Sequence, residues 1–397
     1  MPRKVLSWIA FLVVAVIVVS IANDLLTYRV PREAAVQFGP YSEYTGIIGI
    51  RTVYSDGSGT YKGIGKTCDS LGLDFAIFTD SNTLQPMQDN LAHRFGITLL
   101  IPAVEISSPQ KYGRFFVIGD SVPLLPGKDI TVDSVRRYAM QKGDMVILTR
   151  SGGDAEGLSR NTPDFTGVEI YNFARGWRSN LDFFRINKLI AAYFVYGFTS
   201  KALNYLLEYP AREMKEFDEL NRSRRIVGIA SLNATANIKL GRRSTWQIPS
   251  YASQFNLVRN IIISRVPFNG LYEHDREVLL NSLRHGNCYV AFSGLENARG
   301  FLFTAESDTT VVMMGDSIRL SSTTKLNITL PDSDRVETQV VRNGTVVKTY
   351  NNVGSIIFPV STPGAYRVQA FQKRTMLPFF TKRSFPWILS NPIYVYR

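Results

Sequence analysis

The stretch GIRTVYSDGSGTYKGIGKTCDSLGLDFAIFTDSNT, residues 49–83, contains the arrangement that decides the fold of this chain. It opens at the end of a predicted strand, passes through a Ser-Asp-Gly turn at residues 55–57 and continues into a predicted helix. A second apolar segment, LDFAIFTD at residues 73–80, follows the helix and ends in polar side chains. This strand–helix–strand order favours an α/β sheet with polar residues at the carboxyl ends of its strands.

The same alternation of apolar strands with helices or loops continues to about residue 236. The candidate strands are residues 45–50, 73–80, 98–106, 114–120, 144–150, 167–172 and 225–231. Short strands spaced by helical patterns predict an α/β barrel rather than a sandwich. Each candidate ends in a polar residue or is followed directly by one, so we expect the functional mouth of the barrel at those ends.

The pattern changes after about residue 300 to alternating strands without intervening helices. Asn343-Gly344 lies between two of them, and this dipeptide is typical of a type I′ hairpin turn with positive φ at both positions. We therefore predict a small β-sandwich of immunoglobulin-like size. The predicted division is a membrane anchor at residues 1–23, a connector at 24–45, the barrel at 46–300 and the sandwich at 301–397.

The N-terminal segment, residues 5–22, carries no charge and would form about 27 Å of helix, enough to cross a bilayer. Arg3 and Lys4 precede it, so the positive-inside rule leaves the short N-terminus in the cytoplasm and the bulk of the chain outside. A cleavable signal peptide is the alternative, because Ser20 and Ala22 suit a cleavage site. The apolar run is long for a signal, which favours one retained transmembrane helix.

Composition and cysteine content narrow the partners. The chain has 45 Lys+Arg and 33 Asp+Glu, a net charge of +12, which would attract anionic lipid headgroups or envelope polymers. It shows no nucleic-acid-binding module, so we expect no nucleic acid partner. Its two cysteines are Cys68, on the predicted helix, and Cys288 far downstream, and we expect two buried thiols.

Seven segments resemble blocks of the PHP (polymerase and histidinol phosphatase) family, in particular its exported phosphoesterase-like branch. In order they are YSDGSGT (54–60), GLDFAIFTD (72–80), IPAVEIS (101–107), GVEIYN (167–172), YPAREMKEFDEL (209–220), VGIASLNATA (227–236) and PWILSNPIYV (386–395). The resemblance implies a distorted seven-stranded β/α barrel that holds two or three metal ions at its strand ends.

The family's metal ligands are mostly histidines, and this sequence departs from them at nearly every position. The residues at the family's ligand positions are Gly49 and Arg51 for the first pair, Ser81 after Thr79-Asp80, Glu105, Arg114, Arg150 or else Thr149, and Asn233 with Thr235. Only the glutamate is kept. Arginine stays protonated and has no lone pair to offer, so this set is too weak for a cluster of metal ions.

Other residues do not restore a catalytic site. His93 is placed on a helix, and His274 and His285 share another, where eleven residues would separate them by about 16 Å. Glu105 and Glu169 both end predicted strands, but Glu169 resembles a family residue that needs no glycosidase role. We therefore expect no catalytic residue, no metal and no cofactor.

The three arginines at histidine positions, Arg51, Arg114 and Arg150, leave two interpretations open. They could neutralise the nearby acids Asp56, Asp80 and Glu105 in an internal ion network, which removes the cost of unpaired buried charge. They could instead hold a phosphate, sulfate or carboxylate.

Together these features predict a membrane-anchored, externally facing, catalytically inactive PHP-like protein. It would act as a binding or assembly component, with the membrane, an anionic ligand, or a membrane or envelope protein as partner. The alternative is a residual metal-dependent phosphoesterase.

Overall fold

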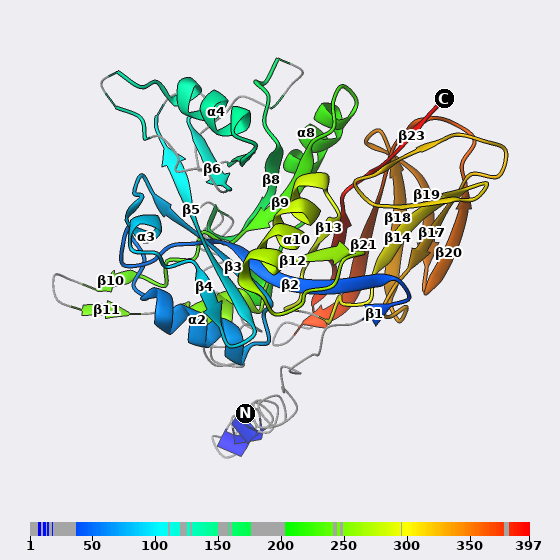
Figure 1. Ribbon diagram of the computed structural model, residues 1–397. Helices are drawn as coiled ribbons and strands as arrows, with labels where there is room; N and C mark the ends of the chain where they lie inside the picture. Colours follow the sequence, from blue (N-terminus) through cyan, green and yellow to red (C-terminus); the bar gives the residue numbers. More distant parts are fainter. Residues whose placement is uncertain are drawn as a thin grey trace.

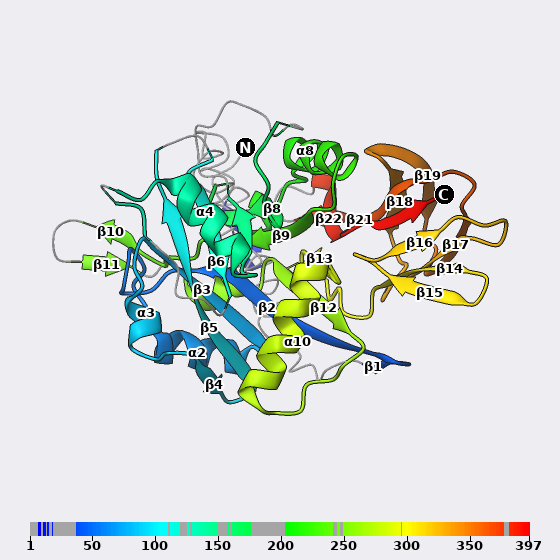
Figure 2. The same cartoon turned by 45° about the horizontal axis from the view of Figure 1, so that its top comes forward.

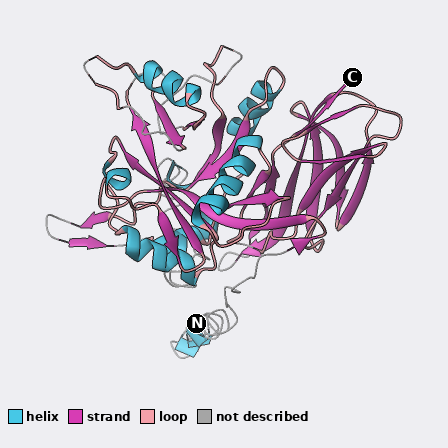
Figure 3. Ribbon diagram, in the orientation of Figure 1, coloured by secondary structure: helices cyan, strands magenta, loops and turns pink. Residues whose placement is uncertain are grey.

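The computed structural model of the chain (Figure 1) is of mixed α/β class, as predicted. It describes residues 7–8, 11–12, 14–15, 18, 37–109, 112–119, 125–127, 129–149, 158, 161–175, 203–240, 244–246, 249–294, 296–376 and 381–397. Helices surround the strands of the first part, whereas the C-terminal part consists of strands (Figure 3).

All seven strands predicted in the first part are present. They are β2 (Tyr41–Ile50), β3 (Phe75–Ser81), β5 (Thr98–Ser107), β6 (Arg114–Ile118), β7 (Met145–Leu148), β8 (Gly167–Asn172) and β9 (Val227–Ser231). Each pairs with the next in this order. The backbone after β9 returns to β2, where Leu232 N donates to Ile48 O at 3.0 Å and Ala234 N to Gly49 O at 2.9 Å.

One strand departs from the expected direction. β6 runs antiparallel to both β5 and β7, whereas the β2–β3, β3–β5, β7–β8 and β8–β9 pairs are parallel. Arg114, at the start of β6, therefore lies where the parallel strands end. Gly119 lies at the opposite end, where its carbonyl accepts a hydrogen bond from Arg276. The expectation that every strand ends at the same mouth is wrong for β6.

Seven helices lie in the described residues, and three of them begin at a side-chain cap. They are α2 (Tyr61–Ser70), α3 (Gln85–Gln88), α4 (Val132–Gln141), η1 (Asn204–Leu206), α8 (Ala211–Asn221), α9 (Tyr251–Phe255) and α10 (Tyr272–His285). Thr60 and Thr131 cap α2 and α4 by accepting hydrogen bonds from the backbone of the first turn. Cys68 on α2 and Cys288 are buried free thiols, as predicted.

His93 does not lie on a helix. It begins the short strand β4 (His93–Phe95), which pairs antiparallel with β5 through a tight turn at Gly96-Ile97. Gly96 has φ +56°, a value that glycine adopts without strain, so the local sequence closes a hairpin where we expected a helix.

The sheet extends beyond these strands on the other side of β2. β1 (Gln37–Phe38) and β12 (Arg259–Ser264) pair with the first half of β2, and β13 (Cys288–Ala291) pairs with β12. β2 thus begins before the predicted barrel start at residue 46. A separate hairpin joins β10 (Ile238–Leu240) to β11 (Ser244–Trp246).

The C-terminal part contains ten strands in its described residues. They are β14 (Leu302–Ser307), β15 (Thr310–Met313), β16 (Ser317–Arg319), β17 (Lys325–Thr329), β18 (Val336–Arg342), β19 (Thr345–Asn351), β20 (Ser355–Pro359), β21 (Gly364–Met376), β22 (Thr381–Ser390) and β23 (Ile393–Tyr396). β15, β14, β17 and β20 form one sheet, and an apolar core separates it from the others. Asn343 and Gly344 have φ +48° and +81°, which confirms the predicted positive φ at both turn positions.

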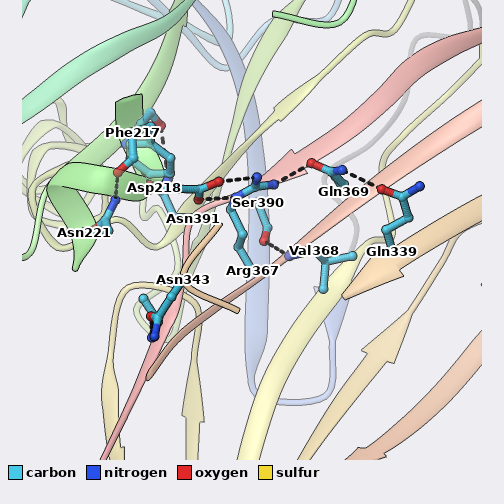
Figure 4. A network of polar contacts seen from close by, with 12 residues as sticks. Phe217, Asp218, Asn221, Gln339, Asn343, Arg367, Val368, Gln369, Ser390 and Asn391 are labelled. Atoms are coloured by element: carbon cyan, nitrogen blue, oxygen red, sulfur yellow. Dashed lines mark hydrogen bonds and ion pairs between the residues drawn. The ribbon is translucent and has the colours of Figure 1, made fainter. Parts of the chain in front are cut away.

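The two parts share a sheet and a polar junction. β22 pairs with β13, so backbone hydrogen bonds join residues on the two sides of the predicted domain boundary at residue 300. The boundary itself stays a prediction. Figure 4 shows the second link, in which the buried Arg367 donates two hydrogen bonds of 2.7 Å to Asp218 on α8. Gln369 continues this line of contacts to Gln339 on β18. Strand β21, which carries Arg367, is therefore fixed to α8 by a charged pair with both groups hydrogen-bonded.

The predicted membrane span at residues 5–22 falls mainly outside the described residues. Among the helices that the structure describes, none combines the length and apolar character needed to cross a bilayer.

Candidate functional site

Strands β3, β5, β6, β7 and β9 bring a group of polar residues, which includes the predicted site residues Glu105 and Arg114, onto one face. Ile77, Ala103, Phe116, Ile147 and Ile229 lie in one apolar cluster. Side chains alternate along a strand, so the residues two positions nearer the strand ends point to the same side. These are Thr79, Glu105, Arg114, Thr149 and Ser231; with Arg51, which follows β2, we call them the strand-end cluster.

Arg51 holds two carboxylates in this cluster. Its Nη2 lies 2.5 Å from Glu105 Oε2, and its Nη1 lies 2.9 and 2.8 Å from the two oxygens of Asp56. The Glu105 side chain is 1 % exposed, whereas that of Asp56 is 50 % exposed. The structure therefore contains one branch of the expected ion network, centred on a guanidinium that is partly buried, with its side chain 14 % exposed.

The charges in this group affect one another's protonation. Burial raises the pKa of Glu105 above its ordinary value, although the Arg51 guanidinium acts in the opposite direction. Burial tends to lower the pKa of Arg51, but the Glu105 and Asp56 carboxylates outweigh it and raise that pKa. Arg51 thus remains a permanent cation beside a carboxylate that ionises with difficulty.

Asp80 does not join the arginine network. It is fully buried, and it accepts hydrogen bonds from Thr52 N at 2.7 Å, Thr52 Oγ1 at 2.9 Å and Ser55 Oγ at 2.6 Å. These bonds hold the turn after β2 in place. Gly57 is required in the same turn, because a Cβ there would lie 2.1 Å from the Arg51 carbonyl oxygen. Ser81, next to Asp80, is partly exposed at the end of β3.

Arg114 and Thr149 are adjacent across the β6–β7 pairing. Thr149 N donates to Arg114 O at 3.0 Å, and Arg114 lowers the pKa of Glu105 through its charge. Within the described residues, no hydrogen bond or ion pair involves the Arg114 guanidinium, and the buried Thr149 hydroxyl has no partner. Arg150 lies outside the described residues, so its place relative to this pair is open.

Asn233 and Thr235 lie in the loop between β9 and β10, whose first residues are hydrogen-bonded to the end of β2. Asn233 has φ +45°, and its buried Oδ1 has no hydrogen-bond partner in the described chain. The Thr235 carbonyl accepts hydrogen bonds from Ser58 N and Tyr251 Oη, each at 3.0 Å. The backbone at Thr235 thus closes the loop, while the Asn233 side chain leaves an acceptor near the strand ends.

Glu169 is a member of the site that the sequence prediction left out. It is buried and accepts hydrogen bonds from Ser231 Oγ and, at 3.0 Å to each oxygen, from Asn172 Nδ2. It also borders a cavity of about 310 Å³ with Arg175 and Glu213, whose side chains pair at 3.1 Å. The signal available in the sequence was a glutamate within the strand candidate at residues 167–172.

These residues do not fit the metal cluster that the family resemblance implies. Glu105 and Asp56 accept hydrogen bonds from Arg51, and Asp80 and Glu169 accept hydrogen bonds from hydroxyl and amide groups. Among the described side chains, no group of three or more His, Cys, Asp or Glu is placed to hold a metal ion. The three histidines are elsewhere and contact Leu91, Asp275 and Asn281.

Comparison with known proteins gives limited similarity. No protein family and no curated protein matches the sequence. Among solved structures, the chain is similar to a two-domain protein from Bacteroides vulgatus described as containing a predicted PHP-like metal-dependent phosphoesterase. The match has 12% identity and a TM-score of 0.42, and it covers 89% of this chain and 97% of that one.

Proposed function

We propose that this chain is a membrane-anchored, outward-facing protein with a PHP-like barrel that has lost phosphoesterase activity and serves as a binding or assembly component. In this proposal the seven strands β2 to β9 close into the distorted barrel, and the strand-end cluster forms its mouth. The observation that carries the proposal is the Arg51 guanidinium bound between Glu105 and Asp56.

Arg51 supplies the positive charge at the position where the resemblance implies a metal. Glu105, the retained ligand residue, is 1 % exposed and already accepts a hydrogen bond from Nη2 of Arg51. A metal ion would have to break this buried pair, and such a loss typically costs about 3–5 kcal/mol. The guanidinium cannot itself polarise a phosphoester as a metal does or activate water at neutral pH.

The binding element that we propose at the mouth is Arg114 with Thr149. Arg51 and Arg114 balance the charges of Glu105 and Asp56, so the group as a whole offers no large positive field. The Arg114 donors and the Thr149 hydroxyl nevertheless suit one oxyanion, such as a phosphate, a sulfate or a carboxylate. Of the two arginines that the structure describes, the anion-binding proposal therefore assigns Arg114, with Thr149, and not Arg51, which is already paired with Glu105 and Asp56.

Membrane anchoring is supported by the described residues of the N-terminal run. Trp8 and Phe11 are 67% and 65% exposed, and Leu12, Val14 and Val18 are also more than half exposed. Apolar side chains exposed along a helix favour contact with lipid over contact with the folded part of the chain.

The test uses the full-length protein in detergent, exposed to Zn²⁺, Mn²⁺ or Fe²⁺, desalted, and examined by elemental analysis and by hydrolysis of p-nitrophenyl phosphate. We expect substoichiometric metal and no hydrolysis. A stoichiometric metal with turnover would establish the residual phosphoesterase instead.

A thermal-shift titration with phosphate and sulfate tests the binding element separately. We expect the anions to raise the melting temperature of the wild type and of the surface control Arg137→Gln, but not that of Arg114→Gln. Equal shifts in all three proteins would contradict the assignment of Arg114.

A further inference from the structure

We infer that an exposed apolar strip beside β1 rests on the lipid bilayer and orients the outer part of the protein against it. The strip consists of Ile97, Val266, Leu271 and Val311, which are 43%, 50%, 67% and 48% exposed. The inference depends on the membrane anchor in the proposed function, but not on the chemistry of the strand-end cluster.

The strip is held by an ordered loop between β12 and α10. The Phe268 ring stacks on Tyr44 at 3.6 Å with an interplanar angle of 8°, and Phe268 N donates to the Tyr44 hydroxyl at 2.6 Å. The fully buried Asp275 accepts hydrogen bonds from Asn269 N at 2.7 Å and Gly270 N at 3.0 Å. Val266 and Leu271 therefore protrude from a fixed backbone, which lowers the entropy cost of docking.

Two arginines connect the ends of the strip to the same loop. Arg94 donates to the Ile97 carbonyl at 2.7 Å and pairs with Asp275, which places the β4–β5 turn next to residues 269–270. Arg265 donates to the Val311 carbonyl at 3.1 Å, which places β15 next to Val266. The four apolar side chains thus belong to neighbouring segments that are distant in sequence.

The strip lies where the chain arrives from the predicted membrane span. Ser264 at the end of β12 pairs with Ser42 near the start of β2, and β1 pairs with the same end of β2. The Arg265 guanidinium lies 5.8 Å from the centre of the Tyr41 ring. In Figure 2, β1, the start of α10 and β4 all lie along the lower edge of the view.

The tether keeps this face near the bilayer. Residues 23–36 separate the apolar run from β1, and fourteen residues (36 − 23 + 1) extend at most about 50 Å. A surface held at such a distance meets the bilayer at high effective concentration, so modest apolar burial and attraction of Arg265 to anionic headgroups suffice for contact. The short tether therefore favours lipid, rather than a soluble protein, as the occupant of the strip.

The experiment places a fluorescent label on the strip of the full-length protein in liposomes. In Leu271→Cys a nitrobenzoxadiazole label is attached to the new thiol. Cys68 and Cys288 are buried, and wild type treated with the same reagent should take up no label. Ile357→Cys, at a 65% exposed position on β20, is the matched control, and Val14→Cys reports insertion of the anchor. Liposomes containing doxyl-labelled phosphatidylcholine quench labels that touch the bilayer.

We expect several-fold stronger quenching at positions 271 and 14 than at position 357, and the same result at position 266 in Val266→Cys. Quenching at 14 with none above the control at 271 and 266 would overturn the inference while leaving the anchor intact. No quenching at 14 would refute the anchor and the inference together. Neither result bears on the loss of phosphoesterase activity, which the metal and hydrolysis assays decide.

Discussion

Replacing Arg51 with alanine should lower the free energy of unfolding by about 3–5 kcal/mol near neutral pH. The magnitude follows from what the substitution leaves behind. The Glu105 carboxylate, 1 % exposed, would lose its guanidinium partner at 2.5 Å and remain as a buried unpaired charge. Asp56 is 50 % exposed and stays hydrated, so its lost pairing should add less than about 1 kcal/mol.

The effect of Arg51→Ala should depend on pH in a defined direction. Burial already raises the pKa of Glu105 above the value of 4.5 that it has when unfolded, and loss of Arg51 raises it further. A carboxyl with a raised folded pKa stabilises the protein fully below its unfolded pKa, and this contribution is lost as pH rises through the folded pKa. The deficit of the variant relative to wild type should therefore be smallest near pH 4.5 and grow toward neutral pH.

Thermal unfolding of the full-length protein in detergent measures this effect. A loss of about 3–5 kcal/mol corresponds to a fall in melting temperature of roughly 6–20 °C for a domain of this size. Arg51→Ala/Glu105→Gln should recover part of the loss, because it removes the stranded charge. The exposed pair Arg137–Asp133 supplies the control, and Arg137→Ala should change stability by less than about 1 kcal/mol. A small, pH-independent effect of Arg51→Ala would refute the buried ion pair.

Three further outcomes are expected. Burial raises the pKa of Asp74, which accepts a hydrogen bond from Thr45 N, from 3.8 to about 6, so the stability that its protonated form contributes is lost as pH rises through about 6. Asp74→Asn should make the free energy of unfolding, measured in urea, fall less between pH 3.8 and about 6 than it does in wild type. Thr149→Val should leave stability unchanged or raise it by up to about 1 kcal/mol in the same assay, because a buried hydroxyl without a partner among the described residues is removed; a clear loss would reveal a structural bond. Asp218→Ala should lower the free energy of unfolding by about 3–5 kcal/mol, because it leaves the buried Arg367 without its carboxylate partner, and should make the C-terminal sheet more susceptible to limited proteolysis. Unchanged resistance to the protease would show that the junction does not depend on this pair.

Local sequence patterns were sufficient for most individual elements. The seven strand candidates of the first part are all present because each is a short apolar run flanked by polar or glycine residues, a signal that does not depend on distant partners. The positive φ values at Asn343 and Gly344 follow from the conformational freedom of those two residue types. Burial of Cys68 was predicted because an unpaired cysteine behaves as a small apolar residue, and in the structure it lies on the buried side of α2.

Contacts between distant segments could not be derived in this way. The antiparallel direction of β6, the pairing of β22 with β13 and the hairpin at His93 depend on which strand edges meet, and the hydrophobic period of one strand does not encode its neighbour. For the same reason, the sequence did not show which arginine or hydroxyl group each buried carboxylate of the site would contact.

The sequence by itself determined which chemical groups are present on the seven strand candidates of the first part: the glutamates Glu105 and Glu169, several arginines and no histidine. That is a statement about side-chain identity, and it holds whatever the packing. Only the tertiary structure decided that Arg51 binds Glu105 and Asp56, that Asp80 binds Thr52 and Ser55 instead, and that Glu169 joins the site through Ser231. The physical reason is that a charge pair forms over a few ångströms between residues far apart in the chain, so distance and burial, set by the fold, select the partner.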